Sequence, residues 1–308
     1  MDGVIIVRKK AGYTSSDVVT ILRGILHMKK IGHTGTLDPQ AEGVLPVCLG
    51  RATRAAELLT AETKEYVTRM VFGYETDTQD TTGQITDSRD YTFSEEAFRA
   101  AVRKLTGEIR QVPPMYSAIR IDGQHLYDLA RQGVSVERPA RTVVIYEAEI
   151  LELDEKSAML RIVCSKGTYI RTLVTDIGRE AGFLASMEKL TRTRSGSFTL
   201  DQAMTLEEIR QSVQDGGIGQ KIIPLDDIFS GYPQGRVLAE DENRLRNGNP
   251  LRLDRICHTG GTNPQPALEQ AAQDPEQLIA MHLPDGAFAG LYRIRPDTGM
   301  AVCFKMFG

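Results

Sequence analysis

The sequence is poor in cysteine and has no long apolar run, and both absences limit the class of protein. Its four cysteines, Cys48, Cys164, Cys257 and Cys303, are scattered, without the paired spacing of a zinc site or a disulfide framework. No stretch approaches the roughly 20 apolar residues that a membrane-spanning helix needs. The short apolar run near the N-terminus precedes its charges, which is the reverse of a secretory signal. We therefore expect a cytoplasmic protein with reduced thiols and no membrane partner.

Composition and charge indicate an ordinary globular protein. The 308 residues are 41% apolar and 25% charged, which is enough to bury one large core or two smaller ones. The net charge of −4 argues mildly against a nucleic-acid partner, because proteins that hold RNA phosphates usually carry a basic excess. The segment 161–194 is nevertheless locally basic. A solvated surface is the simpler interpretation of such a run.

Hydrophobic periodicity and capping residues predict a mixture of helices and strands. Ser15 and Ser16 are N-cap candidates for a first helix, and Ser94 is one for a second. Thr205 with Glu208 forms a capping box for another helix. Further helices are expected near 52–60 and 170–177, and strands at 4–7, 44–48, 65–72, 142–152, 158–164, 287–294 and 300–307.

The chain changes character after a glycine-rich segment around 215–235. Beyond it come a short turn, NRLRNGNPL, a polar stretch at 258–276 and the last two β-like runs. We expect an α+β domain of about 230 residues followed by a small β-rich domain.

The segment 32–47, GHTGTLDPQAEGVLPV, is the densest candidate for chemistry. Its glycines suggest a backbone that needs special conformations or the close approach of a ligand. It contains neither a Walker GK[ST] nor a GxGxxG fingerprint, which disfavours a phosphate-cradling NTPase. Taken alone, Asp38 before Pro39 is more simply a turn residue, and His33 is more simply a hydrogen-bonded loop residue.

The 23-residue run 32–54, GHTGTLDPQAEGVLPVCLGRATR, resembles the signature motif of the TruB family of tRNA pseudouridine-55 synthases. Three further segments are similar to that family in the expected order, namely 64–73 (KEYVTRMVFG), 112–131 (VPPMYSAIRIDGQHLYDLAR) and 164–178 (CSKGTYIRTLVTDIG). The resemblance covers about the first 200 residues, whereas the C-terminal part is similar only to a small RNA-binding domain of the PUA type.

The resemblance implies a pseudouridine synthase catalytic domain at 1–231, with a mixed, mainly antiparallel sheet flanked by helices. It also implies an RNA-gripping insertion at about 112–140 and a small β-rich, PUA-like RNA-binding domain at 232–308. Aromatic and basic residues are interleaved in the insertion, as in RNA clamps, and a hairpin packed against the sheet is the alternative. The implied partner is the T-arm stem-loop of tRNA, bound by a monomer that needs no metal and no organic cofactor.

The resemblance also assigns roles to individual residues. Asp38 is the implied catalytic carboxylate, Arg171 is its cationic partner, and Tyr66 is the ring on which the flipped base stacks. Leu190 is implied as an apolar wall beside the base, and His33 as a contact to the RNA loop in place of the displaced base. The other implied RNA contacts are Gly35, Thr36, Met115, Tyr116, Lys166 and Tyr169. Judged one at a time, Tyr66 and Leu190 are more simply core residues. Arg171, judged in the same way, is more simply an exposed helix residue.

Pseudouridine formation breaks the N1–C1′ bond, turns the uracil over and rejoins it through C5. A carboxylate can attack C1′ or remove a proton from C2′, and both routes stay open. Two other functions also stay open: the catalytic subunit of a guide-RNA pseudouridylation particle, and a non-catalytic tRNA-binding or folding protein. A glycoside hydrolase is a weaker alternative, because the usual second carboxylate has no evident candidate.

Two segments depart from the family pattern. Arg8-Lys9-Lys10 stands where the family usually has Asp-Lys-Pro, and Leu190-Thr191-Arg192-Thr193 stands where it usually has Leu-Arg-Arg-Thr. We expect these changes to affect contacts to the RNA backbone and not the chemistry. The stretch 256–277 has no counterpart in the family.

Overall fold

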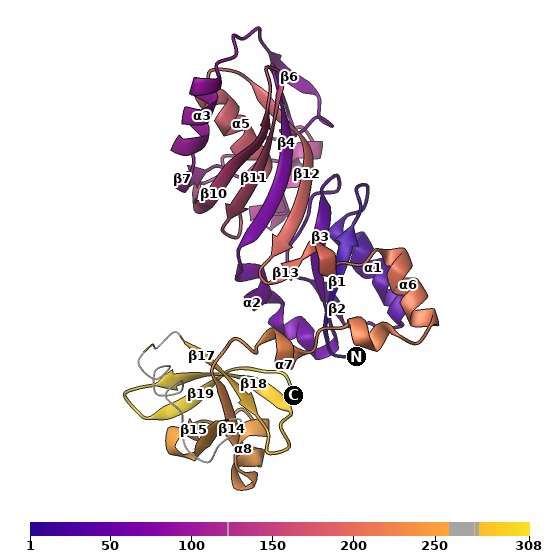
Figure 1. Ribbon diagram of the computed structural model, residues 1–308, viewed down its shortest axis with the longest axis vertical. Coiled ribbons are helices and arrows are strands. Elements are labelled where there is room, and N and C mark those ends of the chain that lie inside the picture. Colours follow the sequence, from indigo (N-terminus) through magenta and orange to yellow (C-terminus); the bar gives the residue numbers. More distant parts are fainter. Residues whose placement is uncertain (122, 259–273, 275–276) are drawn as a thin grey trace.

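The computed structural model describes residues 1–121, 123–258, 274 and 277–308. Figure 1 shows an elongated molecule, with a large sheet and its helices in the upper and middle parts and a smaller sheet at the lower end. Among the helices in these ranges, none combines the length and the apolar character that a membrane crossing requires. The predicted α+β architecture, with a β-rich C-terminal unit, is confirmed.

The large sheet has nine strands within the described residues and runs in the order β1-β3-β12-β4-β11-β10-β7, with β2 beside β3 and β13 beside β12. Its strands are β1 (Gly3–Lys9), β2 (Ile31–His33), β3 (Glu42–Leu49), β4 (Lys64–Phe72), β7 (Gly107–Gln111), β10 (Arg141–Leu153), β11 (Ser157–Cys164), β12 (Ala185–Ser195) and β13 (Phe198–Thr199). Every pairing is antiparallel except that of β3 with β12, which is parallel. The predicted mixed, mainly antiparallel sheet is therefore confirmed.

The parallel contact between β3 and β12 explains one glycine of the 32–47 run. Gly43 lies beside Arg192 in this contact and has a φ of +106°. A Cβ on Gly43 would collide with the backbone of Arg192, and side-chain-bearing residues rarely adopt this φ. A glycine is therefore required at the β3–β12 contact. This contact joins the two halves of the sheet, one formed by β1, β2 and β3 and the other by the strands from β12 to β7.

The described residues form eight α-helices, and two pairs of them cover the large sheet. The helices are α1 (Ser15–Leu26), α2 (Ala56–Ala61), α3 (Glu95–Lys104), α4 (Leu126–Arg131), α5 (Ile170–Glu180), α6 (Leu206–Gln214), α7 (Leu225–Ile228) and α8 (Glu242–Arg246). In Figure 1, α3 and α5 lie together on the upper half of the sheet, and α1 lies beside α6 on the lower half. The predicted caps at Ser94 and Thr205 are confirmed, with hydroxyls that accept from Ala97 N–H and Glu208 N–H at 3.2 Å each.

The predicted cap of the first helix, Ser15 or Ser16, is wrong. The N-cap is Thr14, whose hydroxyl accepts from the Asp17 N–H at 3.0 Å. The Asp17 carboxylate in turn accepts from the Thr14 N–H at 2.8 Å, so one pair satisfies two donors. Ser15 instead points inward, where its hydroxyl accepts from the Leu37 N–H at 2.9 Å.

Helix α5 is fixed by the apolar stripe that the sequence predicts. Ile170, Leu173, Val174 and Ile177 are all buried against the sheet. Each such side chain contributes about 1.5–3 kcal/mol by leaving water. The first turn of α5, which carries Arg171, is therefore held firmly against β12 and β4.

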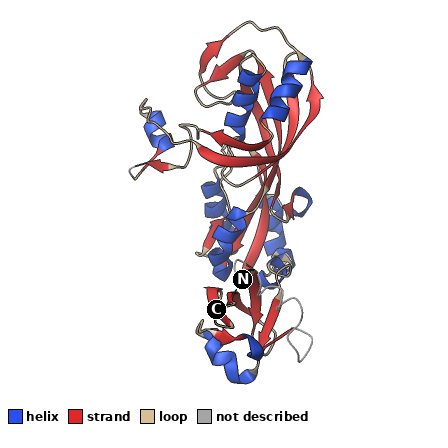
Figure 2. Ribbon diagram, turned by 90° about the vertical axis from the view of Figure 1, so that its left-hand side faces the viewer, coloured by secondary structure: helices blue, strands red, loops and turns tan. Residues whose placement is uncertain are grey.

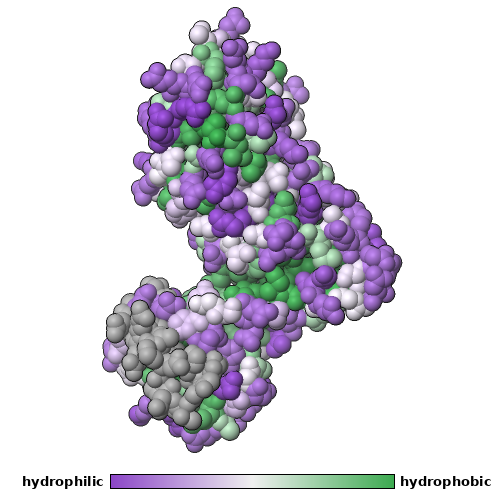
Figure 3. Space-filling model, in the orientation of Figure 1, coloured by the Kyte–Doolittle hydropathy of each residue, from purple (hydrophilic) through white to green (hydrophobic). Residues whose placement is uncertain are grey.

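The second sheet lies at the lower end in Figure 1 and runs in the order β15-β19-β18-β17-β14-β16. Its strands are β14 (Gln234–Val237), β15 (Leu251–Arg252), β16 (Ile256–His258), β17 (Leu278–His282), β18 (Phe288–Arg295) and β19 (Met300–Met306). Phe229, which follows α7, packs on Phe288 and Phe307 at ring distances of 5.5 and 5.6 Å. Beside them, His282 Nε2 lies 2.7 Å from Asp226 Oδ1. These contacts join the second sheet to the first, and Figure 3 shows apolar surface in the concavity where the two units meet.

Residues 112–140 contain a unit of their own, visible as the hairpin and helix that project sideways in Figure 2. Strands β8 (Arg120–Ile121) and β9 (Gln124–His125) pair only with each other among the described strands, and α4 follows directly. His125 stacks on Tyr127 at 5.0 Å, and Arg131 lies 5.6 Å above the same ring. Within the described residues, this hairpin therefore adds no strand to the large sheet.

Several elements are not among those that the sequence predicts. Strand β12 is missed because two bulges, at Met187/Lys189 and at Arg192/Arg194, interrupt its alternation of inward and outward residues. The polar segment 74–91 contains the hairpin β5 (Tyr74–Thr76) and β6 (Ile85–Ser88), and the expected NRLRNGNPL turn begins inside α8. Most of the polar stretch 258–276 lies outside the described residues.

Candidate active site

Asp38 lies in the loop between β2 and β3, and side chains from distant elements hold that loop. The buried hydroxyl of Ser15 on α1 accepts from the Leu37 N–H at 2.9 Å. Leu37 itself is 3% exposed, so its side chain anchors the residue before Asp38 in the core. The backbone that carries the carboxylate is therefore fixed on its N-terminal side.

Lys9 holds the same loop on the other side of Asp38. Its Nζ donates to the carbonyls of Pro39 at 2.9 Å and Ala41 at 2.6 Å. Lys9 is 1% exposed, and this burial lowers its pKa to about 8, although Asp38 and Glu42 act in the opposite direction. Within the Arg8-Lys9-Lys10 segment, this lysine therefore faces the protein interior and not solvent.

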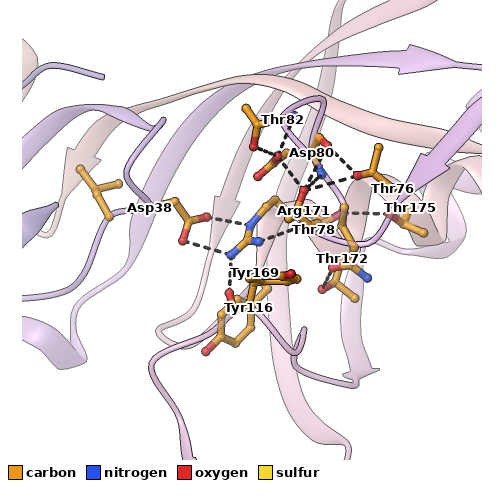
Figure 4. Close-up of polar contacts among 12 residues, drawn as sticks. Asp38, Thr76, Thr78, Asp80, Thr82, Tyr116, Tyr169, Arg171, Thr172 and Thr175 are labelled. Carbon is orange, nitrogen blue, oxygen red and sulfur yellow. Dashed lines mark hydrogen bonds and ion pairs between the residues drawn. The ribbon is translucent and has the colours of Figure 1, made fainter. Parts of the chain in front are cut away.

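Arg171, in the first turn of α5, contacts both carboxylate oxygens of Asp38 (Figure 4). Its Nη2 donates to Oδ1 at 3.1 Å, and its Nε lies 2.8 Å from Oδ2 as an ion pair. The Nε–H is not aligned for a hydrogen bond with any described residue, so this second contact is a charge attraction. Nη1 donates to the Thr78 carbonyl at 2.8 Å and Nη2 to the Tyr116 carbonyl at 2.9 Å. The Arg171 side chain is 5% exposed and the Asp38 side chain 32%, so the carboxylate alone is open to a ligand.

Gln111 fixes the start of α5 relative to the large sheet. Its amide oxygen accepts from the Tyr169 N–H at 2.8 Å, and its amide nitrogen donates to the Tyr169 carbonyl at 3.0 Å. Tyr169 is the N-cap residue of α5 and has no side-chain cap. The buried Gln111 side chain therefore pairs with both backbone groups of Tyr169, as a neighbouring strand would. In this way it sets the position of the first turn of α5, which carries Arg171.

Asp38 and Arg171 form part of the wall of a cavity of about 340 Å³, a size within the roughly 300–1,000 Å³ of ligand pockets. Eight of the residues that the sequence assigns to a site line this cavity: Gly35, Thr36, Asp38, Tyr66, Lys166, Tyr169, Arg171 and Leu190. They come from the β2–β3 loop, from β4, from β12 and from the segment that enters α5. The cavity thus lies where the two halves of the large sheet meet.

Tyr66 and Leu190 lie on neighbouring strands and are 9% and 6% exposed. Burial raises the pKa of Tyr66, and the nearby Arg192 guanidinium opposes that rise. Arg192 is 1% exposed and donates to the Val44 carbonyl at 2.7 Å and to the Gly35 carbonyl at 3.3 Å. The phenol is therefore neutral at physiological pH and faces a fixed positive charge.

Three of the residues implied by resemblance do not line the cavity. His33 ends β2, and its Nδ1 accepts from the Gly35 N–H at 3.4 Å. Burial, followed by the Arg192 charge, lowers the pKa of His33, so its ring is neutral at physiological pH. Met115 and Tyr116 lie at the entrance to the insertion, where Tyr116 contacts Arg171 through its carbonyl and Asp77 through its hydroxyl, at 3.3 Å.

Other cavity residues are not predicted as site residues, and strand periodicity could have indicated two of them. Lys64 precedes Tyr66 by two positions on β4, and Arg192 follows Leu190 by two on β12, so each pair shares a face. The Lys64 Nζ donates to the Thr60 carbonyl at 2.7 Å, and burial lowers its pKa to about 8. The remaining unpredicted lining comes from helices α2 and α5, from the insertion and from loops: Thr60, Ile170, Ser117, Ala118, Ile119, Leu37, Ser165, Gly167 and Thr168.

Comparison with families of known proteins gives matches along most of the chain. Residues 23–170 match the TruB family pseudouridylate synthase N-terminal domain, and residues 171–230 match the tRNA pseudouridylate synthase B C-terminal domain. A tRNA pseudouridine synthase B of Geobacillus thermodenitrificans is 44% identical over 261 residues, which is 82% of this chain and 86% of the relative. The same-named protein of Bacillus pumilus is 38% identical over 304 residues, which is 96% of this chain and 94% of the relative.

Solved structures with the same fold include chains from larger complexes. A chain from a Cbf5-Nop10-Gar1 complex is similar with a TM-score of 0.74 and 27% identity, over 99% of this chain and 85% of that one. A chain from an H/ACA RNP bound to a substrate RNA containing 2′-deoxyuridine gives a TM-score of 0.72 and 25% identity at the same coverage.

Proposed function

The chain belongs to the TruB family of pseudouridylate synthases, and from this premise we propose that it isomerises uridine 55 in the T arm of tRNA to pseudouridine. It acts as a monomer in the cytoplasm, without a guide RNA. The observation that carries the proposal is the Asp38 carboxylate, held at two points by Arg171 and open to a cavity of about 340 Å³. This cavity accepts one nucleotide that has left the RNA stack.

Asp38 carries the first step, because Arg171 orients its carboxylate and a carboxylate oxygen can act as a nucleophile or as a base. In one route its oxygen attacks C1′, and the uracil leaves with the N1–C1′ bonding electrons. In the other route the carboxylate takes the C2′ proton, the uracil leaves with the N1–C1′ bonding electrons, and the C1′–C2′ double bond of a glycal forms. C5 then forms the new bond to C1′, as the bond between Asp38 and C1′ breaks in the first route or as C2′ regains its proton in the second. The C5 proton is lost afterwards.

Tyr66 and Leu190 hold the base while it turns. They line the cavity from adjacent strands, with Tyr66 as the stacking ring and Leu190 as the apolar wall. Stacking and apolar contact offset the few kcal/mol that unstacking a base from RNA costs. In this proposal the Tyr66 hydroxyl assists in the removal of the C5 proton, near the positive charge of Arg192.

The projecting insertion and the second sheet serve the RNA outside the cavity. The insertion holds the T-arm stem-loop against the entrance, where Met115, Tyr116 and His33 contact it, and Gly35, Thr36, Lys166 and Tyr169 contact the flipped nucleotide. The unit at 232–308 forms a PUA-like RNA-binding domain beside a catalytic domain at 1–231. Its apolar junction with the first sheet joins this unit to the catalytic domain.

The test is turnover of a bare T-arm stem-loop by the purified chain. We expect tritium release from C5-labelled uridine, and pseudouridine at position 55 in the product RNA. A stem-loop with cytidine at position 55 is the control and should release nothing. Product at another position of the stem-loop would contradict the assignment of position 55 as the target.

The likeness to chains from an H/ACA RNP and a Cbf5-Nop10-Gar1 complex supports one competing function, that of a catalytic subunit in a guide-RNA pseudouridylation particle. The relatives at 38–44% identity favour the stand-alone enzyme, since they are named for tRNA alone. The same assay separates the two, because a particle subunit would need a guide RNA or partner proteins for turnover. A non-catalytic tRNA-folding protein would bind the stem-loop and leave its uridines unchanged.

A further inference from the structure

Ser117 brings a hydroxyl from the insertion into the cavity wall. It follows Tyr116, whose carbonyl accepts from Arg171 Nη2, so Ser117 lies on the Arg171 side of Asp38. The residue is 6% exposed, and its Oγ has no hydrogen-bond partner among the residues that the structure describes. This hydroxyl is therefore buried, unpaired and next to the space where a ligand would bind.

An unpaired hydroxyl in this position is unusual, because buried polar groups in proteins are nearly always hydrogen-bonded. The Tyr169 hydroxyl lies near it, and Ser117 partly offsets the rise in the pKa of Tyr169 that burial causes, but the two do not meet in hydrogen-bond geometry. Both backbone hydrogen-bonding groups of Ser117 are paired, since its N–H donates to the Met115 carbonyl and its carbonyl accepts from the Tyr127 N–H. The fold therefore fixes the residue and leaves its side chain for another partner.

We propose that Ser117 is a substrate contact, whose hydroxyl donates a hydrogen bond to a sugar–phosphate oxygen of the flipped nucleotide. This inference rests on the proposed function. The base belongs against Tyr66 and Leu190, which line the cavity with an aromatic ring and an apolar side chain. The ribose belongs beside Asp38, which acts on its carbons, and Ser117 lies on that side. The acceptor is thus the 2′-oxygen or a phosphate oxygen of the target nucleotide.

The position of Ser117 links RNA gripping to the reaction. Its hydroxyl reaches the cavity only while the start of the insertion stays against Arg171, through the 2.9 Å contact at Tyr116. An RNA held by the insertion is then contacted at the reacting nucleotide by the same segment. Ser117 is for this reason a substrate-binding residue and not only part of the RNA clamp.

The test compares Ser117→Ala with a matched control, Ser195→Ala. Ser195 is also buried, at 2% exposure, with an unpaired Oγ among the described residues, but it does not line the cavity. We expect Ser117→Ala to lower kcat/KM on the T-arm stem-loop about tenfold, the effect of one lost hydrogen bond to a substrate. Ser195→Ala should leave kcat/KM unchanged, and neither change should lower the melting temperature, since each removes an unpaired atom.

Substrate analogues identify the acceptor and exclude a purely structural effect. In the Asp38→Asn background, where turnover does not intervene, Kd is measured with and without Ser117→Ala. The RNAs are the normal stem-loop, one with a 2′-deoxy target nucleotide and one with phosphorothioates flanking the target. The tenfold loss should persist with two of these RNAs and disappear with the one that lacks the normal acceptor.

Three results would overturn the inference: no effect of Ser117→Ala on kcat/KM or Kd, an equal effect of Ser195→Ala, or the same loss with all three RNAs. Failure of the proposed function is distinguishable from these outcomes. In that case the wild-type chain itself would form no pseudouridine at position 55, whereas failure of this inference leaves the wild-type activity intact.

Discussion

Arg171 contacts both carboxylate oxygens of Asp38, with Nη2 at 3.1 Å from Oδ1 and Nε at 2.8 Å from Oδ2. Its guanidinium also donates hydrogen bonds to the backbone carbonyls of Thr78 and Tyr116. One buried guanidinium thus joins the carboxylate to the segment after β5 and to the start of the insertion at 112–140. Arg171 is therefore a positioning residue whose loss should disturb three parts of the site at once.

Replacement of Arg171 by lysine should lower kcat by about 10- to 100-fold with a smaller change in KM. Lysine keeps the positive charge but has one compact donor group in place of the planar fork. The loss of charge-assisted hydrogen bonds worth about 1.5–3 kcal/mol sets the size of the effect. Single-turnover kinetics on the T-arm stem-loop measure it. The matched control is Arg179→Lys, on the same helix and outside the cavity, and equal losses in both variants would contradict the positioning role.

Replacement of Asp38 by asparagine should abolish the reaction while RNA binding persists. Asparagine preserves the shape but can neither attack C1′ nor accept the C2′ proton, so we expect a rate loss of about 10²–10⁴-fold or more. Tritium release and filter binding measure the two properties separately. Asp87→Asn, on the exposed strand β6, is the control. Retained turnover in Asp38→Asn would end the assignment of this residue.

The two roles of Tyr66, as a stacking ring and as a hydroxyl group, can be separated by two substitutions. Tyr66→Phe keeps the ring and should leave Kd for the stem-loop within about twofold, but lower turnover by about 10²-fold or more if the hydroxyl assists C5 deprotonation. Tyr66→Leu also removes the ring, and the loss of stacking, about 1–3 kcal/mol per base, should weaken binding. Wild-type turnover in Tyr66→Phe would leave the hydroxyl without a role.

Local chemistry predicts many elements of this fold from the sequence. Ser94 and Thr205 cap their helices as expected, because the cap hydroxyl and the N–H it satisfies lie within one turn of each other. The turn between β10 and β11 is equally local, since the Asp154 carboxylate accepts from the N–H groups of Lys156 and Ser157. Strand β12 escapes prediction because its alternation is broken by bulges that only its partner strands determine.

The site is harder to predict from local sequence patterns, because its contacts join residues that are far apart in the chain. Asp38 and Arg171 are 133 positions apart, and Gly35 and Arg192 are 157 apart. No periodicity within one helix or strand can reveal such a pair. The family resemblance is what placed Asp38 and Arg171 in one site, and the roles of Lys9 and Ser15 in holding the loop emerged only from the folded chain.

Lys9 gives a pH dependence that can be measured directly. Burial lowers its pKa from 10.5 to about 8 in the folded chain, so between about pH 8 and 10.5 the unfolded chain binds more protons than the folded one. The contribution of Lys9 to stability therefore rises with pH through this window, because the unfavourable burial of the ammonium is relieved as it loses its proton. The comparison is with Lys9→Met, which cannot titrate.

We expect the melting temperature of the wild type, relative to Lys9→Met, to increase from pH 8 to pH 10. The same difference for Lys10→Met should stay flat, since Lys10 is exposed and paired with Glu207 on the surface. Lys9→Met should also slow turnover at pH 7.5, because the Pro39 and Ala41 carbonyls lose their donor and the loop that carries Asp38 loosens. A flat difference for Lys9→Met, with normal turnover, would mean that this lysine neither titrates in the window nor holds the loop.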